Sequence, residues 1–266
     1  MNRFYIINKS DKQSIDIKEK MTKILIDNNF IEDKNKPELC ISVGGDGTML
    51  KAIHHFENIL DTVSFVGVHT GTLGFYTDFI VEEVDLLLES IIKDEYEDIS
   101  YRMLDVVINH ESGHDTFHVI NEARIENNLK TQVLNIKINK DHFETFRGNG
   151  LNFSTASGST GYNKSLGGPI LHPKTNSYVL TEIAAINNIA YRTIGSPLVL
   201  TEKHITEITF TESEGIILGC DSTTIKLCDK YKNIKSIEFK LSRKNVNFIR
   251  YRKLNFLDRV SKNFIK

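Results

Sequence analysis

Apolar and polar residues alternate in a way that predicts strands and helices taking turns along the first hundred residues. Three short apolar runs are typical of buried strands: residues 4–7, 39–43 and 63–68. Three segments have the spacing of amphipathic helices: residues 14–30, 49–60 and 81–92. Strands that alternate with helices favour a parallel sheet with helices on both faces. The sequence therefore predicts an α/β N-terminal domain that spans residues 1–99.

The pattern changes near residue 100, where β-like segments with little helical period begin. They are residues 103–109, 117–125, 133–138, 204–210, 216–220 and 234–241. Such segments predict a β-rich antiparallel second domain over residues 100–237. Residues 178–187 fit a helix and a strand equally well.

Charge is distributed unevenly along the chain, although the net charge is only −2. Residues 238–266 contain nine Lys/Arg against two Asp/Glu. A basic tail of this kind can bind nucleic acid. Apolar residues are interleaved with the basic ones, and no nucleic-acid motif is present, so we expect a folded segment and no nucleic-acid partner.

Composition is that of an ordinary soluble globular protein, with 40% hydrophobic and 26% charged residues. The first ten residues lack the apolar core of a signal peptide, and no apolar run approaches the length of a bilayer span. Cys40, Cys220 and Cys228 are odd in number, and their spacing suggests no metal site. We therefore expect reduced thiols, a cytoplasmic location and no membrane partner.

A glycine-rich turn follows the predicted strand at residues 39–43. Its residues are Gly44, Gly45, Asp46, Gly47 and Thr48, and a helical pattern begins directly after them. Glycines let the backbone approach an anion, and N–H groups at a helix start point toward it. A carboxylate in a phosphate loop could hold Mg²⁺ or take a proton from an attacking hydroxyl. The alternative is a tight turn in which Asp46 caps the helix.

Two further polar clusters lie in the β-rich region. Asn121 and Glu122 fall within an expected strand, where neighbouring side chains face opposite ways, so one could face a ligand while the other orients a neighbour. Taken alone, the pair favours polar residues of an edge strand over a binding site. Residues 154–168 are rich in hydroxyl groups and glycines, which offer short donors to phosphate, ribose or an amide. A flexible linker is the alternative, but apolar flanks favour a loop packed into a core.

Together these clusters resemble the NAD kinase family in its short bacterial form. The similarity extends over nearly the whole chain and includes residues 44–48, 69–75, 121–122, 146–150, 154–168, 191–198 and 250–265. The glycine–aspartate motif alone is shared with diacylglycerol kinases and is similar to phosphofructokinase loops. The combination is specific to one family.

The resemblance implies a kinase that moves a phosphoryl group from ATP to the 2′-hydroxyl of the adenosine ribose of NAD, giving NADP. It implies a homotetramer, with residues 238–266 returning to the first domain and Mg²⁺ held mainly with ATP. Asp46 is expected to be the base. The expected substrate contacts are Gly47, Phe75, Asn121, Glu122, Arg147, Asn149, Thr160, Gly161, Tyr162, Asn163, Lys164, Ser165, Ala184 and Asp221.

The sequence departs from the family pattern at Thr72, Asn149, Ala156, Gly161 and Ser222. We expect Asn149 to read the adenine edge with an amide that can turn round. Such an amide would discriminate only modestly against deamino-NAD. The alternative is a turn residue with a left-handed backbone.

Two other functions share some of these features. A lipid kinase would share the Gly–Asp loop, and a non-catalytic dinucleotide sensor would share the fold. The preference between ATP and polyphosphate, and the acceptance of NADH, are not predicted by the sequence.

Overall fold

The computed structural model describes residues 1–71, 74–252 and 255–266, which form two compact units. The first unit contains residues 1–101 and 244–266, and the second contains residues 102–243. Strands β6 (Glu97–His110) and β17 (Ser236–Arg250) each contribute residues to both units. The predicted combination of an α/β N-terminal domain with an antiparallel β-rich second domain is confirmed.

A parallel sheet forms the centre of the first unit. In it β2 pairs with β1, β1 with β3, and β3 with β4, while β5 and the end of β17 both pair with β4. The strands are β1 (Arg3–Asn8), β2 (Ile31–Glu32), β3 (Leu39–Val43), β4 (Ser64–His69) and β5 (Phe79–Ile80). Every residue of β3 is buried, as expected for a strand covered on both faces.

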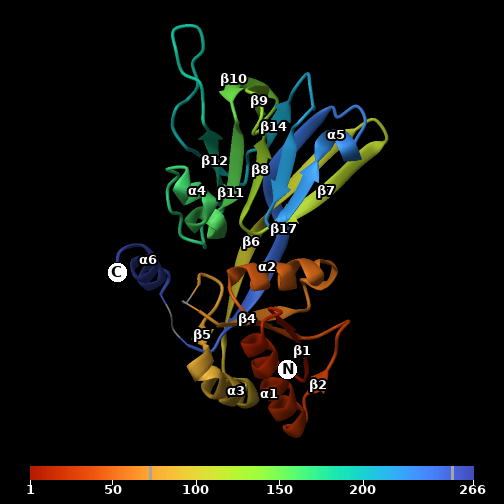
Figure 1. The fold of residues 1–266 in the computed structure, drawn as a ribbon, viewed down its shortest axis with the longest axis vertical. Helices are drawn as coiled ribbons and strands as arrows, with labels where there is room; N and C mark the ends of the chain where they lie inside the picture. The colour runs from red at the N-terminus through yellow and green to blue at the C-terminus, as the bar shows by residue number, and fades with distance from the viewer. Residues whose placement is uncertain (72–73, 253–254) are drawn as a thin grey trace. The chain divides into compact units, whose positions relative to one another are not determined.

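Helices α1 (Lys12–Asp27) and α3 (Val84–Lys93) cover one face of this sheet, and α2 (Asp46–His55) lies on the other (Figure 1). Their apolar stripes explain the arrangement, because Met21 of α1 and Leu87 of α3 share one buried cluster with Ile41 of β3. Asp11 caps α1 by accepting a 3.0 Å hydrogen bond from the N–H of Ser14.

The C-terminal residues fold as helix α6 (Phe256–Phe264) within the first unit. Asn255 caps the helix by accepting from the N–H of Leu257. One residue of this amphipathic helix is buried, and it is Arg259, whose side chain is 2% exposed.

Two antiparallel sheets form the second unit. One follows the order β10, β9, β14, β17, β6, β7, and the other follows β13, β12, β11, β8, β15, β16. The strands not yet given bounds are β7 (Gly113–Val119), β8 (Glu122–Glu126), β9 (Gln132–Ile138), β10 (Asp141–Gly148), β11 (Gly150–Thr155), β12 (Ser177–Ile183), β13 (Leu198–Thr201), β14 (Thr206–Thr209), β15 (Ile217–Cys220) and β16 (Thr223–Lys226). Phe153 of β11 stacks on Phe239 of β17 at 3.7 Å between ring centroids, so the two sheets share one apolar core.

Several expected elements have different bounds in the structure. The helix expected at residues 49–60 begins earlier, at Asp46, and ends at His55 before a short 3₁₀ turn, Glu57–Ile59. The strand expected at residues 117–125 is two strands in different sheets, because the chain bends between Val119 and Glu122. The ambiguous segment at residues 178–187 is strand as far as Ile183.

Short helical turns complete the fold: Val81–Glu83, Ser157–Thr160, α4 (Tyr162–Ser165) and α5 (Leu227–Lys230). Among the described residues, none of the helices has both the length and the apolar character that crossing a bilayer requires. Cys40, Cys220 and Cys228 are all free thiols.

Candidate functional site

The glycine turn sits where β3 ends and α2 begins, as predicted. Gly44 has φ 152°, and a Cβ there would lie 2.2 Å from the Oγ1 of Thr48. Glycine is therefore required at this position by both the backbone and the packing. The N–H of Gly44 donates to the carbonyl of Val68, which ties the turn to β4.

Asp46 is not the helix cap that the alternative interpretation required. Gly45 is the N-cap, with no side-chain bond, and Asp46 is the first residue of α2. Its carboxylate instead accepts two backbone hydrogen bonds, from the N–H of Phe75 at 2.8 Å and of Tyr76 at 3.1 Å. These two bonds fix the carboxylate beside the helix start.

Space is left around the exposed part of this turn. A Cβ on Gly47 would meet nothing within 4 Å among the described residues, and one on Gly45 would meet only the ring of His69, at 3.4 Å. The first N–H groups of a helix have no intrahelical partner, so this helix start can receive an anion beside a fixed carboxylate.

In the second unit, Asp221 holds the chain bend at residues 120–122. Its carboxylate accepts from the N–H groups of Ile120 at 3.0 Å, Asn121 at 2.8 Å and Glu122 at 3.2 Å. Asp221 is 9% exposed and has φ 48°, a conformation uncommon outside glycine. Asn121 therefore lies in this bend, outside the strand predicted for it, and β8 begins at Glu122.

Glu122 is an acid with unusual surroundings. Burial raises the pKa of Glu122 to about 7; the nearby Asp221 adds to the shift and Arg124 opposes it. One carboxylate oxygen, Oε2, is buried without a hydrogen-bond partner among the described residues. A buried acid with an unsatisfied oxygen is a feature typical of functional sites.

The hydroxyl-rich segment is packed into the unit, which contradicts the flexible-linker alternative. Thr155 donates to the carbonyl of Ile120 at 2.5 Å, and Ser157 donates to the same carbonyl at 3.0 Å. A Cβ on Gly158 would lie 2.1 Å from the carbonyl oxygen of Asn121. This segment and the Asn121–Glu122 bend are thus brought together. Ala156, one of the departures from the family pattern, is 5% exposed there.

Residues 160–165 differ from one another in how far they are buried. Asn163 is fully buried; its amide donates to the carbonyls of Ser159 and Pro169, and its oxygen accepts from Thr181. Its side chain therefore supports the loop from within. Thr160 is also buried, whereas Gly161, Lys164 and Ser165 are exposed and Tyr162 is half-buried against Arg124.

Arg147 and Ala184 lie on neighbouring segments of the second unit. The Arg147 guanidinium packs over the Tyr191 ring at 4.2 Å, and the backbone carbonyl of Arg147 accepts from the N–H of Ile186. Ala184 is exposed and adopts φ 46°, which places an alanine in a conformation usually taken by glycine.

Asn149 joins β10 to β11 and is not among the residues with a left-handed backbone, so the turn alternative is wrong in that respect. The nitrogen of its side-chain amide donates to the carbonyl of Asn127 at 3.1 Å, and its backbone carbonyl accepts from the side chain of Gln132. The bond to Asn127 opposes the rotation expected for the amide. Thr72, another departure, lies outside the described residues, and Ser222 is exposed in the turn after Asp221.

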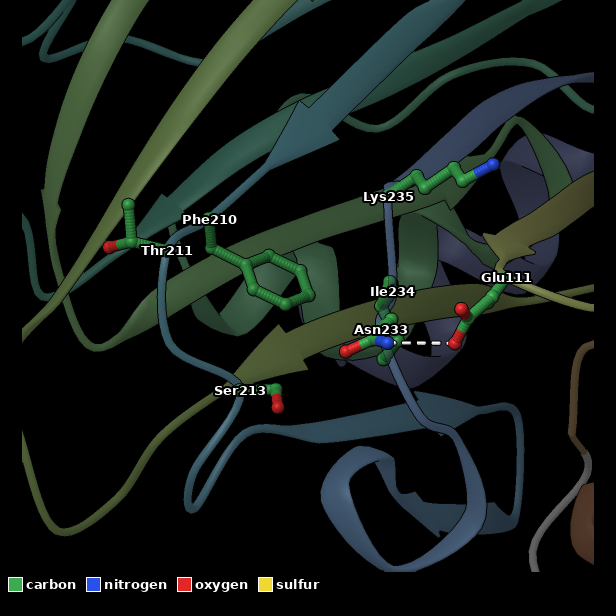
Figure 2. Close-up of a pocket in the computed structure, with 7 residues that line it drawn as sticks. All are labelled: Glu111, Phe210, Thr211, Ser213, Asn233, Ile234 and Lys235. Atoms are coloured by element: carbon green, nitrogen blue, oxygen red, sulfur yellow. Dashed lines mark hydrogen bonds between the residues drawn. The ribbon is translucent and has the colours of Figure 1, made fainter.

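A pocket of about 420 Å³ lies elsewhere in the second unit (Figure 2). Its lining is Glu111, Phe210, Thr211, Ser213, Asn233, Ile234 and Lys235, and it includes no residue predicted for the site. Asn233 donates to Glu111 at 2.7 Å, so two of the polar side chains that line the pocket bind each other. Within the described parts of the chain, no three His, Cys, Asp or Glu side chains could share a metal ion.

Two family models match the chain. The ATP-NAD kinase N-terminal domain matches residues 9–96, and the ATP-NAD kinase C-terminal domain matches residues 119–251. The chain belongs to the ATP-NAD kinase family. The NAD kinase of Staphylococcus carnosus (strain TM300) is 44% identical over 99% of this chain and 97% of its own length. That of Staphylococcus aureus (strain JH9) is 42% identical with the same coverage.

Solved structures of the family share the fold. Yeast NADH kinase complexed with NADH gives a TM-score of 0.81 at 17% identity, covering 100% of this chain and 87% of its own. An NAD kinase from Archaeoglobus fulgidus in complex with ATP gives 0.73 at 20% identity and covers 94% of each chain.

Two interactions that support the candidate site were not predicted from the sequence. They are the backbone bonds from Phe75 and Tyr76 to Asp46, and the contacts of Arg259 with the same loop. A lone arginine inside the amphipathic pattern of residues 256–264 was the one signal available for the latter.

Proposed function

We propose that the protein transfers the γ-phosphoryl group of ATP to the 2′-hydroxyl of the adenosine ribose of NAD, giving NADP and ADP. The observation that carries this proposal is the Asp46 carboxylate. It stands at a helix start directly after a glycine turn, with both oxygens oriented by backbone N–H groups. Family membership agrees with this chemistry.

The reaction needs positioning and charge neutralisation more than covalent help. Each oxygen of Asp46 accepts one backbone bond and so retains a lone pair. Asp46 takes the proton of the 2′-hydroxyl, whose oxygen forms the bond to the γ-phosphorus while the bond to the ADP oxygen breaks. The N-terminal N–H groups of α2 and the glycine turn receive phosphate.

The other predicted residues take supporting roles in this proposal. Gly47 and Phe75 border the NAD, Asn121 and Glu122 hold its ribose, and Arg147 lies toward phosphate. The segment from Thr160 through Gly161, Tyr162 and Lys164 to Ser165 lines the base and nicotinamide ends, and the buried Asn163 supports this segment from within. Asp221 orients the Asn121–Glu122 bend, which its three backbone bonds support.

Two finer contacts complete the binding proposal. Ala184 contacts the carboxamide through its backbone. Asn149 accepts from the adenine amino group through its amide oxygen, an orientation that its bond to Asn127 favours. We expect this bond to sharpen discrimination against deamino-NAD relative to a freely turning amide, because turning would set two oxygens against each other.

Mg²⁺ would be held chiefly by ATP oxygens, because this ion usually keeps several waters and binds substrate phosphates with few protein ligands. When bound, it would neutralise charge on the phosphates. We further propose a homotetramer in the cytoplasm. The resemblance to the NAD kinase family supports this assembly. A monomeric mass by light scattering at micromolar concentration would contradict it.

A coupled assay with NAD and ATP tests the activity. We expect NADP formation in the wild type, and turnover lower by about 10²–10⁴-fold in Asp46→Asn with NAD binding retained within a few-fold. The control is Asp61→Asn, which alters an exposed aspartate of the same unit. Lipid phosphorylation without NADP would instead indicate a lipid kinase, and binding of NAD without turnover would indicate a sensor.

A further inference from the structure

Arg259 of α6 is a buried cation that binds the loop before β5. Its Nη1 lies within hydrogen-bond distance of three carbonyl oxygens, of Gly74 at 2.9 Å, Phe75 at 3.2 Å and Thr77 at 2.7 Å, so its two N–H groups are shared among three acceptors. Its Nη2 pairs with the carboxylate of Asp78. Three carbonyl contacts are more than an ion pair requires, so the guanidinium fixes the backbone of this loop.

The same loop binds Asp46 through its N–H groups. The carbonyl of Gly74 and the N–H of Phe75 belong to one peptide unit, and the carbonyl of Phe75 and the N–H of Tyr76 belong to the next. A trans peptide is planar, and its C=O and N–H point in opposite directions. When Arg259 holds the two carbonyls, the two N–H groups therefore point away from it, and both donate to Asp46.

Aromatic packing adds to this connection. The Phe75 ring stacks near that of Phe264 at 5.6 Å between centroids, and Phe256 lies at 6.3 Å. Both partners belong to α6, like Arg259. Side chains of α6 therefore hold both the backbone of the loop, through Arg259, and the side chain of Phe75, through two aromatic rings.

We propose that Arg259 is a positioning residue for Asp46, acting through the two peptide units at residues 74–76. The inference rests on the proposed role of Asp46 as the base. Arg259 does not touch the reacting atoms; it sets the direction of the N–H groups that orient the carboxylate. Asp78 also faces Arg250, at 3.9 Å between Oδ2 and Nε, so this buried carboxylate has a second cation beside it.

Arg259→Lys is the informative substitution, since an ammonium keeps the charge but cannot span three carbonyls and a carboxylate as a planar guanidinium does. The matched control is Arg252→Lys. Arg252 lies in the same C-terminal segment, where it donates to Glu83 at 2.9 Å and packs over the Phe79 ring, outside the loop at residues 74–77. We expect Arg259→Lys to lower kcat by roughly 10- to 100-fold with KM for NAD and ATP within about threefold, and Arg252→Lys to leave kcat within about twofold.

A double-mutant cycle with Asp46→Asn separates positioning from general damage to the fold. If Arg259 acts through Asp46, Arg259→Lys should cost less than about twofold in kcat once Asp46 is asparagine. An equal fold-loss of kcat in both backgrounds would overturn the proposal. Single-turnover measurement at high enzyme concentration makes the low rates accessible.

Amide hydrogen exchange at Phe75 and Tyr76 gives a readout that needs no turnover. Their protection should fall in Arg259→Lys and stay at the wild-type level in Arg252→Lys. Unchanged protection in Arg259→Lys would refute the proposal. Absence of NADP formation by the wild type would refute the proposed function instead, and the exchange result would still decide whether Arg259 orients this loop. If Arg259→Lys does not fold, Arg259→Gln, which keeps amide donors without a buried charge, takes its place in both measurements.

Discussion

Gly74→Ala should disable the proposed base while leaving the fold nearly intact. A Cβ on Gly74 would lie 2.1 Å from Oδ1, 2.5 Å from Cγ and 2.7 Å from Oδ2 of Asp46. These atoms are the end of a side chain that can rotate, so the backbone need not move. The carboxylate must retreat, and its two bonds from the N–H groups of Phe75 and Tyr76 are lost or lengthened.

The size of the effect follows from the overlap. Removing a contact of 2.1 Å requires the carboxylate to move by roughly 1 Å, and a displacement of about 1 Å can lower a rate by about 10²-fold. That loss corresponds to about 2.7 kcal/mol in the activation barrier. The folded state loses hydrogen bonds worth about 1 kcal/mol net, which should lower Tm by roughly 2–4 °C.

The assay is steady-state kinetics of NADP formation with Tm measured on the same samples. Gly71→Ala is the matched control, because among the described residues a Cβ there would meet only the His69 ring, at 3.4 Å. We expect kcat to fall in Gly74→Ala and to stay within about twofold of the wild type in Gly71→Ala. A wild-type kcat in Gly74→Ala would refute the assignment of Asp46 as a base in the observed geometry.

Three further outcomes are expected. Burial raises the pKa of Glu122 from its ordinary 4.5 to about 7. Between these pH values the folded state binds a proton that the unfolded state has lost, so the stability of the fold falls as pH rises through this range. Glu122→Gln should therefore raise Tm at pH 8 relative to the wild type and have little effect below pH 4.5. Asn149→Asp should lose the donor to the Asn127 carbonyl and destabilise the fold by about 1–3 kcal/mol, measured by urea unfolding. Gly44→Ala should lower Tm because its Cβ would overlap Thr48 at 2.2 Å in a strained backbone; a wild-type Tm would show that the turn can relax.

Much of the site was predictable because it depends on local chemistry. The glycine turn before α2 follows from a buried strand, three glycines and an acid in five residues. The bend at Asn121 was not predictable from its neighbours. A continuous β-like pattern hides the change of sheet between β7 and β8, which depends on the Asp221 carboxylate a hundred residues later along the chain. The role of Asn163 was hidden because its side-chain partners, Pro169 and Thr181, meet it only when the loop folds back on β12.

The sequence by itself determined the class of fold, the order of the main strands and helices in the first hundred residues and the family, because hydrophobic period and short motifs express interactions between near neighbours. Only the tertiary structure decided how Asp46 is held. Its partners Phe75 and Tyr76 lie 29 and 30 residues away, and Arg259, which binds the carbonyls of the same two peptide units, lies 185 residues from Gly74. Those contacts form between one guanidinium, one carboxylate and backbone groups that every residue carries, so no pattern of side chains along the chain records them.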